Sequence, residues 1–365
     1  MKRFVERGAG RTLAGLLFAC VAAAANAEFK DPLTTPATRT ERLTQTPMTA
    51  IAHAGTTRLV AAGWRGVIAV SDDAGGSWKQ ASVPVREDLT ALAFPTATHG
   101  WAAGNEGVLL ETTDGGLTWT KRLDGHIAAK LMVDKYGALA EKAPEDKAVA
   151  TALKEAKGYS AQAPSRPFLD VAFENEQTGY VVGTYGLMFR TTDAGKTWEP
   201  WLDKVENPNG YNIYAIKVVG SEVFLAGELG MALRLDRAQQ RFVKLSTPYE
   251  GSFFTLAAKE SALIAAGLRG NALRTEDAGK SWQKVEFGAA SGLEAPTTFS
   301  GAAVTPEGTV VLVTLSGQVF VSADAGQHFK AVAPKAPMRY SGVAVVGRNT
   351  VVVVGMQGIR TEATN

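Results

Sequence analysis

The stretch "TTDGGLTW" at 112–119 recurs along the chain and decides how the rest of the sequence is interpreted. Its relatives are "SDDAGGSW" at 71–78, "TTDAGKTW" at 191–198, "TEDAGKSW" at 275–282 and the more divergent "SADAGQHF" at 322–329. Five copies of one octapeptide indicate an internal repeat, which has to be recognised before any other feature is read.

Each copy follows a Gly-marked apolar run, and such runs occur more often than the octapeptide itself. They are "LVAAGWRG", "GWAAGNEG", "GYVVGTYG", "VFLAGELG", "LIAAGLRG", "VVLVTLSG" and "VVVVGMQG", with a further apolar piece such as "TALAF" (90–94) upstream of each. Short runs rich in Val, Leu and Ala that are bounded by Gly or Asp predict strands, since helices need about ten residues or more.

Four strands per unit, repeated seven times, predict an all-β fold: a seven-bladed β-propeller of four-stranded antiparallel blades. A solenoid is the alternative architecture. The seventh unit ends at Asn365, in the slot where the other units place the Asp of the octapeptide. We therefore expect "PATRTERLTQT" (36–46) to complete the last blade as an N-terminal outer strand and so to close the ring, which removes exposed sheet edges.

The octapeptide is expected to be structural. Its Asp can accept hydrogen bonds from nearby backbone N–H groups, its Gly permits positive φ, and its Trp can pack between blades. The residues concerned are Asp73, Trp78, Asp114, Trp119, Asp193, Trp198, Asp277, Trp282 and Asp324. A calcium loop of the EF-hand type would need more carboxylates and a Glu at its twelfth position. The fourth unit keeps Asp236 in "RLDRAQQRF" (234–242) but lacks the Gly and Trp, so an altered turn is expected there.

The pattern S/T-x-D-x-G-x-T/S-W is the Asp box, or BNR repeat. Together with the Gly-marked strands at this spacing, it resembles the photosystem II stability and assembly factor family over about residues 38–365. The resemblance implies a non-catalytic, WD40-like propeller that binds protein, in photosynthesis or beside a membrane transporter. The implied partner is a subunit of a membrane-protein complex or transporter.

The first residues predict export. Basic residues, an apolar run and the small-residue site Ala25-Asn26-Ala27 read as a signal peptide over 1–27, which leaves 28–365 as the propeller. Lipid attachment at Cys20 is the alternative. Either reading places the protein in the periplasm or outside the cell, peripheral to a membrane at most, because no later run is long enough to span one. Cys20 is the only cysteine, so the mature domain has no disulfide.

Charge and ligand patterns exclude several function classes. Without the four basic residues and one acidic residue of 1–27, totals of 38 and 36 become 34 and 35. This balance gives no reason to expect nucleic acid as a partner. The four histidines have no ligand spacing and no Gly-rich phosphate loop opens a helix, so no metal and no cofactor are expected. We expect a monomer.

Strand alternation places the turn after each second strand, and the links between blades, on the face opposite the Asp boxes. Loops above a rigid frame are free to vary, so partner binding is expected on that face. Its candidate residues are Trp64, Arg65, Arg86, Arg166, Tyr185, Arg269 and Arg339. Five arginines could grip carboxylates of a partner. A solvated rim of mixed charge, with Glu87 and Glu106 among the arginines, is an equally open reading.

Residues 126–167 interrupt the repeat between the second and third units. Their Ala, Lys and Glu content and apolar spacing predict two short helices. We expect them to lie over the variable face as a lid or docking arm, with inert surface decoration as the alternative.

The Asp box also occurs in sialidases, so a secreted glycoside hydrolase is the competing function. Such an enzyme needs a paired acid and nucleophile and arginines for the substrate carboxylate. The early Arg-Ile-Pro signature is absent, Arg166-Pro167 being the nearest string, and no catalytic residue can be nominated. The sequence therefore predicts a protein that is not an enzyme.

Overall fold

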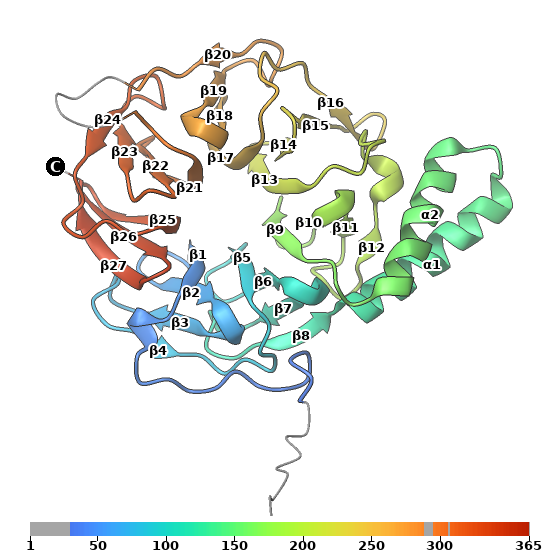
Figure 1. Ribbon diagram of the computed structural model, residues 1–365, viewed down its shortest axis with the longest axis horizontal. Coiled ribbons are helices and arrows are strands. Elements are labelled where there is room, and N and C mark those ends of the chain that lie inside the picture. Colours follow the sequence, from blue (N-terminus) through green and yellow to red (C-terminus); the bar gives the residue numbers. More distant parts are fainter. Residues whose placement is uncertain (1–29, 288–294, 306, 365) are drawn as a thin grey trace, which may run out of the picture. The chain divides into compact units, whose positions relative to one another are not determined.

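The computed structural model describes residues 30–287, 295–305 and 307–364. The predicted signal peptide and Cys20 lie outside these residues. Within the described chain, seven antiparallel sheets surround a common axis (Figure 1), which confirms the seven-bladed propeller. From Asp31 onwards the chain forms one unit.

Each blade runs from an inner strand to an outer one. Blade 1 holds β1 (Met48–His53), β2 (Leu59–Gly63), β3 (Ile68–Ser71) and β4 (Lys79–Gln80); blade 2 holds β5 (Leu89–Ala93), β6 (Gly100–Gly104), β7 (Leu109–Thr112) and β8 (Thr120–Leu123). Blade 3 holds β9 (Phe168–Phe173), β10 (Gly179–Gly183), β11 (Met188–Thr191) and β12 (Glu199–Pro200); blade 4 holds β13 (Ile213–Val219), β14 (Glu222–Gly227), β15 (Ala232–Asp236) and β16 (Arg241–Lys244). Blade 5 holds β17 (Phe253–Lys259), β18 (Ala262–Gly267), β19 (Ala272–Thr275) and β20 (Gln283–Lys284); blade 6 holds β21 (Phe299–Val304), β22 (Val310–Thr314), β23 (Val319–Ser322) and β24 (Lys330–Val332). Blade 7 has three strands, β25 (Tyr340–Gly347), β26 (Thr350–Gly355) and β27 (Gly358–Ala363).

The core lies between blades. Every residue of β2, β6 and β10 is buried, because both faces of each sheet pack against a neighbouring blade. Strands buried on both sides are apolar throughout rather than alternating, which explains the continuous runs seen in the sequence. In the cluster between blades 1 and 2, for example, Trp119 packs with Val60 and Val70.

The ring closes between the first and last blades. Met48 and Leu59 of blade 1 share a hydrophobic cluster with Val352 and Val354 of blade 7. Nε2 of His53 lies 2.9 Å from the carbonyl oxygen of Val345 on β25. The first and last blades therefore pack against each other face to face, as neighbouring blades do elsewhere in the ring.

The segment at 36–46 lies beside blade 7 but adds no strand to it, contrary to the sequence expectation. Its 3₁₀ turn η1 (Leu43–Gln45) is next to β27, and blade 7 keeps three strands. The reason is that its first half is held by blade 1: Gln80 accepts from the backbone N–H of Thr40 at 2.9 Å and donates to the carbonyl of Thr38 at 2.8 Å. The segment bridges the outer edges of blades 1 and 7.

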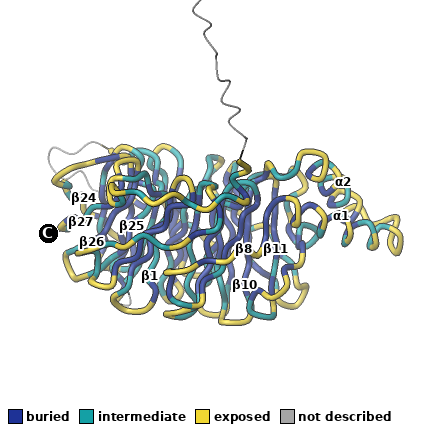
Figure 2. The backbone as a smooth tube through the Cα atoms, turned by 90° about the horizontal axis from the view of Figure 1, so that it is seen from below, coloured by how far each residue is buried: buried dark blue, intermediate teal, exposed yellow. Residues whose placement is uncertain are grey.

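Two helices follow β8, as the sequence predicts: α1 (Gly125–Lys142) and α2 (Lys147–Gln162). Asp124 caps α1 and Asp146 caps α2, each accepting hydrogen bonds from the first backbone N–H groups of its helix. The hairpin projects from the rim of the disc next to β12 and does not cover either face (Figures 1 and 2), so the expected position over the variable face is wrong. Because β8 is the outermost strand of its blade, a helix that continues from it starts at the periphery.

Candidate protein-binding face

The Asp boxes form closed turns between the third and fourth strands. In blade 2, Oδ1 of Asp114 accepts from the backbone N–H of Thr118 at 3.0 Å and from the hydroxyl of Thr112 at 2.8 Å. Its Oδ2 accepts from the Thr118 hydroxyl at 2.6 Å, and Gly116 follows at a φ of 95°. The same arrangement recurs at the boxes of blades 1, 3 and 5. In blade 6 the imidazole Nδ1 of His328 takes the place of the hydroxyl beside Oδ2 of Asp324.

These hydrogen bonds stabilise the charged carboxylates. At Asp73 the Ser77 hydroxyl, the Ser77 N–H and the Ser71 hydroxyl lower the pKa to about 2. The corresponding bonds lower the pKa of Asp277 as well. These carboxylates direct their hydrogen bonds into their own turns, and the described residues contain no cluster of metal-ligating side chains.

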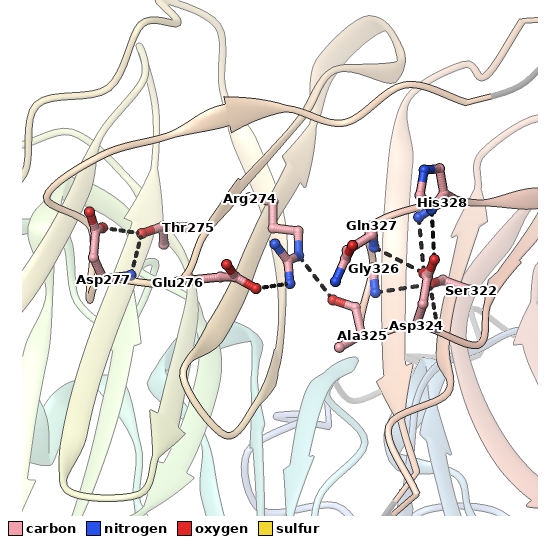
Figure 3. Close-up of polar contacts among 10 residues, drawn as sticks. All are labelled: Arg274, Thr275, Glu276, Asp277, Ser322, Asp324, Ala325, Gly326, Gln327 and His328. Atoms are coloured by element: carbon pink, nitrogen blue, oxygen red, sulfur yellow. Dashed lines mark hydrogen bonds and ion pairs between the residues drawn. The ribbon is translucent and has the colours of Figure 1, made fainter.

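The box turns also join neighbouring blades. Figure 3 shows Arg274 of blade 5 beside the box of blade 6, where its Nε donates to the carbonyl of Ala325 at 3.0 Å. Arg58 of blade 1 similarly donates to the carbonyl of Asp114 in blade 2 at 3.0 Å. In blade 4 the turn at Asp236 differs, as expected, and its Oδ1 accepts only from the N–H groups of Ala238 and Gln239.

The opposite face is built from the turn after each second strand and the links between blades. Backbone hydrogen bonds bring the two together: Thr184 donates to the carbonyl of Pro167 at 3.3 Å, and Met356 donates to that of Arg339 at 3.1 Å. We call this surface the turn face. It includes η2 (Trp64–Gly66), η3 (Asn105–Gly107), η4 (Thr184–Gly186) and η6 (Leu268–Gly270).

Several turns hold a large side chain in left-handed backbone geometry. Arg65, Tyr185 and Arg269 have φ values of 55°, 56° and 56°. Bulky residues seldom adopt this region, and such outliers concentrate at functional sites. Neighbouring links support them: the N–H of Arg65 donates to Oδ1 of Asp88 at 2.7 Å, and that of Tyr185 to Oδ1 of Asn212 at 2.8 Å.

The turn face exposes large apolar and cationic side chains. Of the large hydrophobic residues exposed in the described chain, Trp64, Tyr185, Leu229 and Met356 lie on these turns, with Tyr185 57% exposed. Arg65, Arg269 and Arg339 are exposed, and their guanidinium groups make no hydrogen bond or ion pair to any described residue. Arg86 is also exposed, and its guanidinium donates to the Thr38 hydroxyl at 2.8 Å.

Arg166 differs from the other four arginines, because the structure buries it to 6% exposure. Its guanidinium lies 5.1 Å from the ring centre of Tyr159 and 4.7 Å from that of Tyr185, and it pairs with Glu155 at 3.3 Å. Arg166 is therefore not presented to a partner as the sequence suggested. Tyr159 and Glu155 belong to α2, which packs against the segment between α2 and β9 that carries Arg166. The repeat pattern does not include α2 and so could not predict this contact.

The central channel carries charges that sequence reasoning missed. It encloses about 960 Å³ between the inner strands and is lined by His53, Asp170 and Lys217, among others. Asp170 accepts from the N–H groups of Val171 and Ile216, both at 2.8 Å; burial raises its pKa to about 6 and lowers that of Lys217. At the position of Asp170 the other inner strands place Ala, Gly or Thr, so aligning the units would have revealed it.

A family model described as photosynthesis system II assembly factor YCF48 matches residues 40–135 and 160–335. The chain belongs to the YCF48 family. A curated relative, the photosystem II assembly lipoprotein Ycf48 of Synechococcus sp. (strain CC9902), is 27% identical over 119 residues, which are 32% of this chain and 35% of the relative. The match thus spans about a third of that relative's length. No helix in the described residues is both long and apolar enough to cross a membrane.

Solved structures share the fold with this YCF48 family member. A structure of YCF48 bound to D1 peptide has a TM-score of 0.60 at 16% identity, covering 88% of this chain and 94% of that one. YCF48 from Cyanidioschyzon merolae has a TM-score of 0.59 at 12% identity, covering 88% and 96%. The WD40 propeller domain of Doa1 has a TM-score of 0.62 at 9% identity, covering 92% and 97%. At these identities the likeness concerns the fold.

Proposed function

We propose that this protein is a non-catalytic, exported scaffold that holds a subunit of a membrane-protein complex or transporter through its turn face. Membership of an assembly-factor family supports a role in assembly. A relative described as a lipoprotein supports export, and a related propeller bound to D1 peptide supports a peptide segment as the bound element.

The observation that carries the proposal is the set of unpartnered groups on the turn face. The guanidinium groups of Arg65 and Arg339 are exposed and have no hydrogen bond or ion pair to any residue that the structure describes. Trp64, which precedes Arg65, and Met356, whose N–H donates to the carbonyl of Arg339, are exposed as well. Blades 7 and 1, which carry these four residues, are neighbours in the ring. Aromatic and arginine side chains dominate binding energy at protein interfaces, and a guanidinium can hold a carboxylate with two parallel hydrogen bonds.

Binding of this kind should depend on salt. Exposed guanidinium groups attract an acidic segment over about one Debye length, roughly 8 Å at physiological ionic strength. Charges of this kind mainly raise the association rate, while the apolar side chains limit dissociation. An acidic peptide with at least one apolar anchor is therefore the partner chemistry that the turn face fits.

The test is site-specific photo-crosslinking in cells that express the full chain. A crosslinking amino acid at Trp64 or Tyr185 should capture a membrane-protein subunit. The same group at Leu117, a comparably exposed residue in the Asp box of blade 2, is the matched control and should not. Equal capture from Leu117, or capture from Leu117 alone, would exclude the turn face as the binding surface. A synthetic D1 peptide added to the purified protein then shows whether a photosystem subunit is the partner.

Export is tested by the mass and N-terminus of the mature protein. Cleavage by a signal peptidase leaves Glu28 as the first residue, whereas lipid attachment leaves an acylated Cys20. A cytoplasmic protein with an intact N-terminus contradicts both forms of the proposal.

A further inference from the structure

The helical hairpin lies largely outside the family pattern. The two matched segments end at 135 and resume at 160, so the end of α1 and most of α2 have no counterpart in the family model. The hairpin is nevertheless fixed to the propeller. Met132 and Tyr136 share a buried cluster with Phe189 and Trp198 of blade 3. The Tyr136 hydroxyl accepts from the N–H of Leu202 at 2.8 Å.

A second attachment connects α2 to the turn face through Arg166. Its guanidinium contacts the Tyr159 ring on α2 at 5.1 Å and the Tyr185 ring on η4 at 4.7 Å. Tyr159 is fully buried, whereas Tyr185 is 57% exposed. One cation thus joins a buried ring of the hairpin to an exposed ring of the proposed binding surface.

The charge of Arg166 is compensated by few groups. Glu155 is its one ion-pair partner in the described chain, at 3.3 Å, and its Nε has no acceptor there. A buried charge with incomplete pairing is costly, and the faces of aromatic rings are the remaining source of stabilisation. The Arg166 side chain therefore favours a conformation of Tyr185 that keeps its ring over the guanidinium.

The backbone conformation of Tyr185 does not determine the rotamer of its side chain. The hydrogen bond from its N–H to Asn212 and its φ of 56° fix the main chain of the turn. At a turn tip with this exposure, the ring would otherwise move among rotamers on a timescale of picoseconds to nanoseconds. Within the described residues, the aromatic or cation contact of this ring is the one with the Arg166 guanidinium, at 4.7 Å.

We propose that Arg166 is a positioning residue through which the hairpin orders Tyr185 on the turn face. The hairpin then shapes the binding surface on the blade 3 side without covering it, and gives this chain a partner preference that the family pattern does not encode. The consequence for binding rests on the proposed function; the ordering of Tyr185 does not.

The first experiment needs no partner. A 3-fluorotyrosine is placed at residue 185, and its ¹⁹F resonance is compared with that of the denatured protein. In the parent a displaced, broadened resonance is expected. Arg166→Met and Tyr159→Leu should move it to the denatured value and sharpen it. Tyr136→Phe is the matched control: it removes the hydroxyl that accepts from the N–H of Leu202 but touches neither Arg166 nor Tyr185, and should leave the resonance unchanged.

An unchanged resonance in Arg166→Met overturns the proposal, as does an equal change in Tyr136→Phe. If circular dichroism shows that Arg166→Met does not fold, Tyr159→Leu, which keeps the cation, decides. Crosslinking supplies the second readout: Arg166→Met should lower capture from residue 185 several-fold and leave capture from residue 64 unchanged. Absence of capture from both positions in the parent rejects the proposed function. The ¹⁹F measurement still tests whether Arg166 orders the Tyr185 ring.

Discussion

The two faces of the propeller use their turns in opposite ways. On the Asp-box face, Asp114 and its equivalents direct their carboxylates into their own turns. On the turn face, Arg65 and Tyr185 are held by backbone bonds while their side chains extend outward. The difference shows which residues maintain the ring and which are available to a partner.

The repetition itself follows this division. A turn that satisfies its own hydrogen bonds tolerates only a few residue types, so Asp, Gly and Trp recur. A turn whose geometry is secured by its backbone accepts Trp, Glu, Tyr or Arg at its tip, as η2, η3, η4 and η6 do. Sequence regularity therefore marks structure, and irregularity marks the surface that selection can adapt.

The largest effect is expected from two tryptophans, one on each face. Trp119→Ala removes a side chain that is 6% exposed and packs between blades 1 and 2, so unfolding free energy should fall by about 3–5 kcal/mol. Trp64→Ala removes one that is 39% exposed on η2, and the loss should stay within about 0.5 kcal/mol. Urea unfolding followed by circular dichroism measures both. Similar losses for the two variants would contradict the division between the faces.

The next effect concerns the box carboxylate. Asp114→Ala removes the acceptor for the N–H of Thr118 and for the hydroxyls of Thr112 and Thr118, and should cost about 1–3 kcal/mol. Asp236→Ala, in the altered turn of blade 4, is the comparison and should cost less, because that carboxylate accepts no hydroxyl. A larger loss for Asp236→Ala would show that the box network is not the source of stability.

The sequence predicts the Asp-box face in detail and the turn face only in outline. Spacing and residue type specify the box, since Asp114, Gly116 and Trp119 each meet a local requirement. The position of η1, the rim location of the hairpin and the burial of Arg166 depend on contacts between segments far apart in the chain. Gln80 holds residues 38–40 against blade 1, and Tyr159 of α2 packs against Arg166. A local sequence pattern does not reveal contacts of this kind.

A smaller effect should appear in the pH dependence of stability, with opposite signs for two kinds of aspartate. The pKa of Asp73 is lowered to about 2, so its contribution is complete above the unfolded pKa of about 4 and is lost as pH falls from about 4 towards 2. The pKa of Asp170 is raised to about 6, so its contribution falls as pH rises from about 4 to 6. Urea unfolding across this range should show that Asp170→Asn removes the loss of stability between about pH 4 and 6 and keeps the loss below pH 4. A decline that persists in Asp170→Asn assigns it to another group.

The smallest effect on the fold, and the largest on binding, is expected for the unpartnered arginines. Arg65→Ala and Arg339→Ala remove no side-chain hydrogen bond or ion pair to the part of the chain that the structure describes, so the free energy of unfolding should change by no more than about 0.5 kcal/mol. Capture of a partner by crosslinking from residue 64 should fall in both variants and become less sensitive to salt, because each variant removes one charge that attracts an acidic segment. Arg58→Ala is the control of equal charge: it should lower stability by releasing the contact with the blade 2 box, yet leave the salt dependence of capture unchanged. If Arg58→Ala alters that dependence as much as Arg65→Ala does, net charge rather than the turn face governs the encounter.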